Sequence, residues 1–453
     1  MAANHPARRS RVELFTAALE YHCKATNSID VDVPSSNLSL PTMKLLCVFS
    51  VLLLTTPSMV VGAAEPAEPA SFVPITRRYD SIFSFGDCYA DTGNDVVVFA
   101  ALSLDNPPAR APYGMTFFGR PTGRNSDGRL IVDFIAEKLG LPLVPPVLQA
   151  HAGSFRQGAN FAVAGAFARD AGLYRAIPIV GPFALNTSSG VQLRWFESLK
   201  PTLCRPAECG GFFRRSLFFM GVFGISDYSF SVFGKTLPQI RSFVPDVVNT
   251  ISAATEVTTI HSIAYDPLPG GLISKAELNH KPGSTNNSWQ RLIKHGASTV
   301  VVPGVPPLGC LPPNLAFFPS ADPAAYDSRT GCLMELNDLA AYHNSLLQEA
   351  LQSVRTAHPD ARVIYADFFS PVVEMVESPD KFGFRRDVLR CCCGGGGRYN
   401  MNASAGCGMP GATVCQDPST YLFWDGHLTE AAYRYIAHAW LSSINDGKGK
   451  QTY

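Results

Sequence analysis

The chain has 453 residues, of which 46% are hydrophobic, and it carries 37 basic and 37 acidic side chains. This balance provides no electrostatic attraction to nucleic acid or to an anionic membrane surface, so neither is expected as a partner. The length and apolar content are sufficient for a large buried core, and a single α/β domain can reach this size.

The N-terminal region carries a targeting pattern. Residues 1–42 differ from the rest and are predicted to be a non-native or disordered extension. Met43 and Lys44 then precede an apolar run, LLCVFSVLLL, which leads to small residues at 61–64. This order predicts a signal peptide over 43–64, a short linker over 65–78, and secretion to the extracellular space or cell wall. The run is shorter than the ~20 residues that a transmembrane helix needs, so no stable membrane anchor is expected; an uncleaved signal anchor is the alternative.

The cysteines fit a secretory route. Of 12 cysteines, all but Cys23 and Cys47 follow the predicted signal peptide, and so many in a secreted chain predict disulfides. The expected pairs are Cys204–Cys209, Cys310–Cys332, and two members of the triplet 391–393 with Cys407 and Cys415. A zinc site at the triplet is the alternative, but its ligand spacing is wrong. Glycosylation sequons begin at Asn186, Asn286 and Asn402.

Between residues 79 and 445, short apolar runs alternate with amphipathic helical patterns, which predicts βα units, a parallel sheet and one domain, with a tail at 446–453. The expected strands are 81–85, 217–222, 299–302 and 362–366. The expected helices are one capped by Ser126 with apolar positions from Leu130 to Leu139, one within 332–358, and one over 429–441 capped by Thr429. Ligand sites in such sheets lie at the carboxyl ends of the strands, where Cys88 and Ser226 fall.

Five segments in chain order carry family motifs. Residues 85–94 read FGDCYADTGN, 120–129 RPTGRNSDGR, 158–166 GANFAVAGA, 391–394 CCCG, and 424–430 WDGHLTE. Together they resemble the plant branch of the GDSL (SGNH-type) ester hydrolases over most of the chain. The resemblance implies a flavodoxin-like three-layer α/β/α sandwich with a mostly parallel sheet. It also implies hydrolysis of acyl or acetyl carboxylic esters, small or polymer-linked, without a metal or organic cofactor.

The resemblance assigns the site by position. Cys88 takes the place of the nucleophile, His427 is the base, and Asp425 is the acid that orients His427. The oxyanion hole would be formed by the backbone N–H of Cys88, the N–H of Gly165 and the side chain of Ser226. A nucleophile, a base and an orienting carboxylate are the groups that acyl transfer needs, together with donors placed for the developing oxyanion.

Three departures from the family pattern concern this site. Cys88 stands where the family has serine, and a thiol is reactive only as thiolate. Ser226 stands where the family has asparagine, in GISD at 224–227. One residue, Gly426, separates Asp425 from His427, where the family has two. We therefore expect weakened activity, with Gly426 able to absorb the altered spacing. The alternatives are an inactive binding protein that keeps the scaffold for a glycan, lipid or protein, and a gene-model error at these positions.

Other candidate residues have simpler explanations. Asp87 and Asp91 are predicted to hydrogen-bond the loop that presents Cys88 rather than to act as acids. His343, in the middle of a predicted helix, is interpreted as a packed histidine. The glycine run 394–397 lacks the Lys-Ser/Thr pair of a phosphate loop and is interpreted as part of a disulfide-rich loop.

Overall fold

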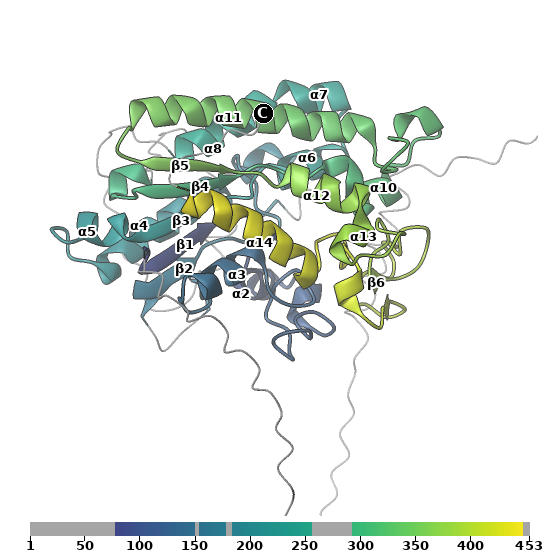
Figure 1. Ribbon diagram of the computed structural model, residues 1–453, viewed down its shortest axis with the longest axis horizontal. Coiled ribbons are helices and arrows are strands. Elements are labelled where there is room, and N and C mark those ends of the chain that lie inside the picture. Colours follow the sequence, from purple (N-terminus) through teal and green to yellow (C-terminus); the bar gives the residue numbers. More distant parts are fainter. Residues whose placement is uncertain (1–77, 150–153, 178–183, 256–291, 447–453) are drawn as a thin grey trace, which may run out of the picture.

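The computed structural model describes residues 78–149, 154–177, 184–255 and 292–446. The predicted signal peptide and the sequon at Asn286 lie outside these residues. Five parallel strands form one sheet in the order β2-β1-β3-β4-β5 (Figure 1). The strands are β1 (Ser81–Phe85), β2 (Gly158–Asn160), β3 (Ser216–Met220), β4 (Thr299–Pro303) and β5 (Arg362–Ala366). Four of them match the predicted strands, whereas the short edge strand β2 was not predicted.

Helices surround this sheet (Figure 1). They are α2 (Asn94–Leu102), α3 (Ile131–Lys138), α4 (Ser189–Leu203), α5 (Cys209–Arg214), α6 (Ile225–Ser231), α7 (Leu237–Ser242), α8 (Val244–Thr255), α10 (Pro312–Phe317), α11 (Met334–Ala357), α12 (Phe369–Glu377), α13 (Pro379–Phe382) and α14 (Glu430–Asn445). A separate two-stranded ribbon pairs β6 (Cys393–Gly394) with β7 (Thr413–Val414). Among the described residues, no helix is both long and apolar enough to cross a bilayer.

Adjacent residues of β3 show how the layers form. Side chains alternate between the two faces of a strand. Phe218 packs edge-on against Phe196 of α4, with ring centroids 5.8 Å apart, whereas Phe219 stacks on Trp440 of α14 at 6.4 Å. Helices α4 and α14 therefore cover opposite faces of the sheet. Because both faces are covered, the central strands β3 and β4 are nearly continuous apolar runs, which is why they could be read from sequence, whereas β2 is Gly-Ala-Asn and has no such run. The predicted three-layer sandwich is confirmed.

One predicted helix start is wrong. Ser126 does not cap α3, which begins at Ile131; instead, Asp133 accepts a hydrogen bond from the N–H of Leu130, the residue before the helix, at 2.9 Å. Ser126 accepts from the N–H of Gly128 at 3.2 Å within the preceding loop. A serine can satisfy a loop N–H as well as a helix N–H, so composition alone did not separate the two.

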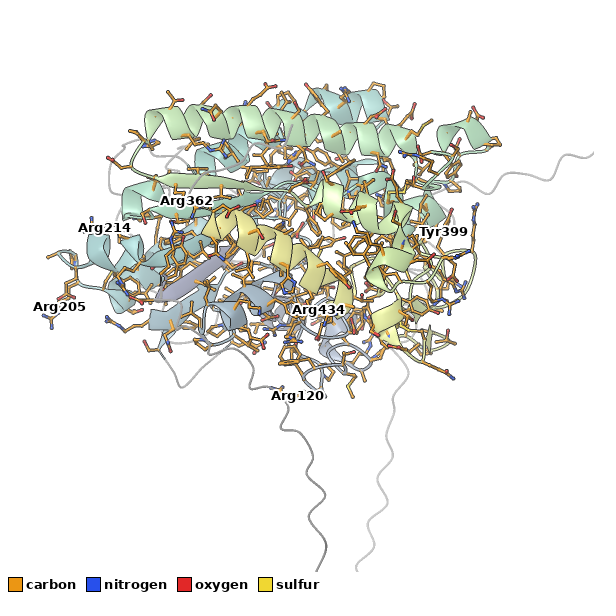
Figure 2. The ribbon with its side chains drawn as sticks, viewed as in Figure 1. Arg120, Arg205, Arg214, Arg362, Tyr399 and Arg434 are labelled. Carbon is orange, nitrogen blue, oxygen red and sulfur yellow. A yellow bond between two sulfur atoms is a disulfide. The ribbon has the colours of Figure 1, made fainter. Side chains whose placement is uncertain are left out.

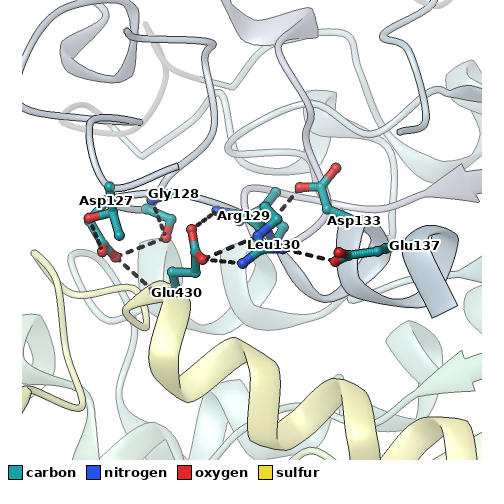
Figure 3. A network of polar contacts seen from close by, with 9 residues as sticks. Asp127, Gly128, Arg129, Leu130, Asp133, Glu137 and Glu430 are labelled. Atoms are coloured by element: carbon teal, nitrogen blue, oxygen red, sulfur yellow. Dashed lines mark hydrogen bonds and ion pairs between the residues drawn. The ribbon is translucent and has the colours of Figure 1, made fainter. Parts of the chain in front are cut away.

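Helix α14, which follows the predicted catalytic histidine, is fixed at both ends. Thr429 caps it by accepting from the N–H of Ala432 at 3.3 Å, as predicted. Glu430 receives hydrogen bonds from the N–H and guanidinium of Arg129, and its own N–H donates to Asp127 at 2.7 Å (Figure 3). At the other end, Arg362, labelled in Figure 2, donates to the carbonyls of residues 443, 444 and 446. The helix extends to Asn445, beyond the predicted 441.

A buried ion pair gives the first prediction. Arg124 and Asp133 form two hydrogen bonds of 2.8 Å, and their side chains are only 7% and 0% exposed. Asp133→Ala leaves a buried guanidinium unpaired, so we expect urea denaturation to show a loss of about 3–5 kcal/mol in the free energy of unfolding. The control is Glu374→Ala, which breaks the exposed pair with Lys381 and should cost about 0–1 kcal/mol. Equal losses in both variants would contradict the prediction.

Candidate active site

The loop after β1 presents Cys88 at the carboxyl edge of the sheet. Gly86 is held from both sides by Gln192, which accepts from its N–H at 2.9 Å and donates to its carbonyl at 2.8 Å. The N–H of Asp87 donates to Val222 in the loop after β3 at 3.1 Å. Cys88 is the one partly exposed residue between positions 81 and 95. The chain thus fixes a buried loop in which Cys88 alone is partly exposed.

Asp425 and His427 are brought together despite their short separation. One carboxylate oxygen of Asp425, Oδ1, lies 2.8 Å from Nδ1 of His427 and also accepts the backbone N–H of His427 at 3.0 Å. The N–H of Trp424 donates to the carbonyl of His427 at 2.8 Å, which closes a tight turn. A single intervening residue is therefore enough to place the imidazole on the carboxylate.

Gly426 makes this turn possible. Its φ is 150°, a value that side chains rarely allow. A Cβ at this position would also lie 2.7 Å from Cγ of Pro313. The expectation that Gly426 absorbs the altered spacing agrees with this geometry.

Cys88 and His427 lie close enough to shift each other's pKa, so the three predicted side chains gather at one site. Burial raises the pKa of Cys88, and the neighbouring Asp87 raises it further, whereas His427 lowers it in part. Burial also lowers the pKa of His427, but the charge of Asp425, joined by that of Cys88 when the thiol is ionised, raises that pKa well above 6.5. The environment therefore favours the neutral thiol, and it favours a protonated imidazole beside the Asp425 carboxylate.

The predicted oxyanion residues Gly165 and Ser226 follow β2 and β3, the two strands that flank β1. Gly165, with φ of 78°, sits in a partly exposed turn, and a Cβ built there meets no atom within 4 Å. Its N–H has no hydrogen-bond partner among the described residues. Ser226 is in the first turn of α6, immediately after β3, and β3 is the neighbour of β1 in the sheet. Both residues thus belong to the same carboxyl edge as Cys88.

Two buried aspartates connect these loops. Asp91 accepts from the N–H groups of Gly93 and Asn94 in its own loop and from Ala164, the residue before Gly165, at 2.7–2.8 Å. The supporting role predicted for Asp91 is confirmed. Asp227, which sequence reasoning did not single out, accepts from the N–H of Ala168 at 2.8 Å and so ties α6 to the Gly165 loop.

Two further side-chain predictions agree with the structure. Asp87 accepts from the N–H of Tyr89 at 3.0 Å within the loop that carries Cys88. Burial raises the pKa of Asp87 to about 7. His343 is fully buried, with Nδ1 2.7 Å from the hydroxyl of Tyr228, and burial lowers its pKa to about 3. His343 is therefore a packed, neutral histidine, as interpreted from sequence.

The cysteine-rich loop supports the segment that carries Asp425. Its disulfides join Cys392 to Cys415 and Cys393 to Cys407, and the pairs Cys204–Cys209 and Cys310–Cys332 also form. The N–H groups of Cys392 and Cys393 donate to the carbonyls of residues 423 and 424 at 2.9 and 2.7 Å. All the predicted pairings are confirmed. The zinc alternative is wrong because two thiols of the triplet are consumed, which leaves Cys391 free.

Sequence reasoning missed Tyr113. Its hydroxyl donates to the second carboxylate oxygen of Asp425, Oδ2, at 2.5 Å across 312 positions of sequence. No local pattern signals a contact of this range; only the fold brings the two residues together.

A thiol, a histidine and an aspartate at the edge of this sheet are the side-chain types that a triad acyl hydrolase uses. The model of the GDSL-like lipase/acylhydrolase family matches residues 82–440. A GDSL esterase/lipase of Arabidopsis thaliana is 42% identical over 376 residues, covering 81% of this chain and 91% of that protein. Sinapine esterase of Brassica napus is 38% identical, covering 87% and 91%. Acetylajmalan esterase 2 of Rauvolfia serpentina is 38% identical, covering 81% and 90%.

The chain therefore belongs to the GDSL lipase/acylhydrolase family and is an ester hydrolase by family membership.

Proposed function

We propose that this protein hydrolyses carboxylic esters through a thioester on Cys88. The supporting observation is that Cys88 lies beside His427, whose Nδ1 is 2.8 Å from the carboxylate of Asp425. The sulfur attacks the ester carbonyl while its proton passes to His427, and the protonated histidine then gives that proton to the departing alcohol. Water, deprotonated by His427, next attacks the thioester, which releases the acid and returns the proton to sulfur. Asp425 holds the imidazole in the required tautomer throughout.

The oxyanion that forms in each step would lie between the N–H groups of Cys88 and Gly165 and the hydroxyl of Ser226. A serine hydroxyl is shorter than the asparagine amide of the family pattern, and loss of one oxyanion donor costs about 10²–10³ in turnover in other hydrolases. The raised pKa of Cys88 lowers the fraction of reactive thiolate as well. We therefore propose turnover below that of a relative with serine and asparagine at these positions.

The substrate class follows from the relatives. Two are named for sinapine and acetylajmalan, so acyl or acetyl esters of plant metabolites are the first candidates, with cell-wall polymers and lipids as further ester sources. Four disulfides are consistent with an oxidising compartment, which supports the proposed secretion. Of the two sequons within the described residues, Asn402 is exposed and Asn186 is half-buried, so Asn402 is the better placed for glycosylation.

The test uses p-nitrophenyl acetate and butyrate with the wild-type protein and Cys88→Ala. We expect slow hydrolysis by the wild type and loss of it in the variant, with a covalent acyl adduct on Cys88 visible by mass spectrometry after acid quenching. Equal rates in the two proteins would overturn the proposal.

The pH dependence provides a second test. Only neutral His427 can accept the thiol proton, and its raised pKa moves the neutral form to higher pH. The raised pKa of Cys88 acts in the same direction. We expect kcat/KM to rise with pH, with the midpoint of its acid limb above 6.5, the ordinary value for histidine. A profile that is already flat below that value would contradict this prediction.

The second candidate function is binding without turnover. The observation that favours it is the environment of Cys88, where burial and Asp87 both oppose the thiolate. Under this alternative, an ester or its product acid would raise the melting temperature although no hydrolysis is detected.

A further inference from the structure

The carboxylate of Asp425 has partners on both oxygens, and they come from distant parts of the chain. Oδ1 accepts the ring and backbone N–H groups of His427, whereas Oδ2 accepts the hydroxyl of Tyr113 at 2.5 Å. The side chain of Asp425 is only 15% exposed. A carboxylate removed from water needs such donors to remain ionised and fixed in orientation.

Tyr113 is itself held rigidly. It is 2% exposed and packs edge-on against Trp424, the residue before Asp425, with ring centroids 5.9 Å apart. The same small apolar cluster contains Cys392, Cys393 and Cys407, whose disulfides anchor it. The hydroxyl is therefore held toward Oδ2 by a buried ring whose neighbours are linked by disulfides.

We propose that Tyr113 is a positioning residue for the catalytic pair: its hydroxyl fixes the Asp425 carboxylate so that Oδ1 faces His427. This inference rests on the proposed function only in calling the pair catalytic. The turn 424–427 fixes the backbone on either side of Gly426, but the carboxylate can still rotate about its own side-chain bonds. The hydrogen bond from Tyr113 stops this rotation of the carboxylate. It does so in a chain that has one residue between Asp425 and His427, where the family pattern has two.

The ionisation of Tyr113 agrees with a donor role. Burial raises its pKa well above 10, and the negative charge of Asp425 raises it further. The phenol is therefore neutral at every pH at which the protein would act, and it always has a proton to donate. Conversely, burial raises the pKa of Asp425, but His427 and the hydroxyl of Tyr113 together bring it below 3.8.

The test compares Tyr113→Phe with Tyr421→Phe. Tyr421 packs against the same disulfide cluster, but its hydroxyl is not among the partners of Asp425 in the described part of the chain. A hydrogen bond to a charged group corresponds to about 10- to 100-fold in an equilibrium constant. For Tyr113→Phe we expect kcat to fall by about this factor with little change in KM, since the hydroxyl acts on the imidazole and not on the substrate. The acid limb of the pH profile should move to lower pH, because a carboxylate no longer held toward His427 raises the pKa of the imidazole less.

A second readout needs no turnover. Alkylation of Cys88 by iodoacetamide, followed by mass spectrometry across pH, reports the thiolate that His427 stabilises. Tyr113→Phe should shift the midpoint of this curve to higher pH, and Tyr421→Phe should not. If the wild type hydrolyses no ester, the proposed function fails, yet the alkylation curves still decide the role of Tyr113. Coincident curves for all three proteins would overturn the inference.

A third variant covers the case in which Tyr113→Phe does not fold. Incorporation of 3-fluorotyrosine at position 113 keeps the ring and makes the hydroxyl a stronger donor, so it should move the alkylation midpoint to lower pH. A shift in the opposite direction, or none, would count against the inference.

Discussion

The double substitution Cys88→Ser with Ser226→Asn is expected to raise ester turnover by about 10²–10³ over the wild type. Two physical effects add. A serine hydroxyl transfers its proton to His427 during attack and needs no stable anion beforehand, so the burial and the Asp87 charge that oppose the thiolate of Cys88 matter less. An asparagine at 226 supplies a longer amide donor from the first turn of α6.

No insertion after Gly426 is required for this gain. The Asp425–His427 hydrogen bond is formed at 2.8 Å with the spacing as it stands. The experiment measures kcat for p-nitrophenyl acetate in both single variants, in the double variant, and in the double variant with a residue inserted after Gly426. If only the variant with the insertion gains activity, the turn at 424–427 is not a working substitute for the family spacing. If none gains activity, the loss extends beyond these positions.

Asp425→Asn is expected to lower kcat by about 10³–10⁴ with little change in KM. The asparagine amide has no negative charge with which to accept both N–H groups of His427. The proton on Nδ1 is then no longer favoured, so the other ring nitrogen is less often free to accept the proton of the thiol. The raised pKa of His427 should fall toward its ordinary value as well, because the charge of Asp425 is one of its causes. The acid limb of any residual activity should therefore move to lower pH.

The matched control is Asp338→Asn, an exposed aspartate on α11. It changes net charge by the same amount but should leave kcat and the pH profile as in the wild type. A loss below about tenfold in Asp425→Asn would show that the carboxylate does not orient the base.

The sequence determined the family, the strand positions and the place of the site. Apolar runs such as Thr299–Val302 could be read as strands because helices cover both faces of the sheet and no alternation is needed. Cys88 and Ser226 could be placed at one edge because parallel strands end on the same side. The disulfides followed from proximity, since only short loops separate the partners. These features depend on local composition or on topology common to the fold.

Other features depended on contacts between distant segments. The single residue Gly426 can join Asp425 to His427 because the N–H of Trp424 donates to the carbonyl of His427 and because Gly426 has a φ of 150°. Both features exist only in the folded chain. Tyr113 lies 312 positions from the carboxylate that it holds, and Asp227 reaches a loop 59 positions away. Ser126 failed as a helix cap because a nearby loop N–H used its hydroxyl. Two groups form a hydrogen bond only if they are close in space. The sequence alone shows which groups are close only when they are a few residues apart.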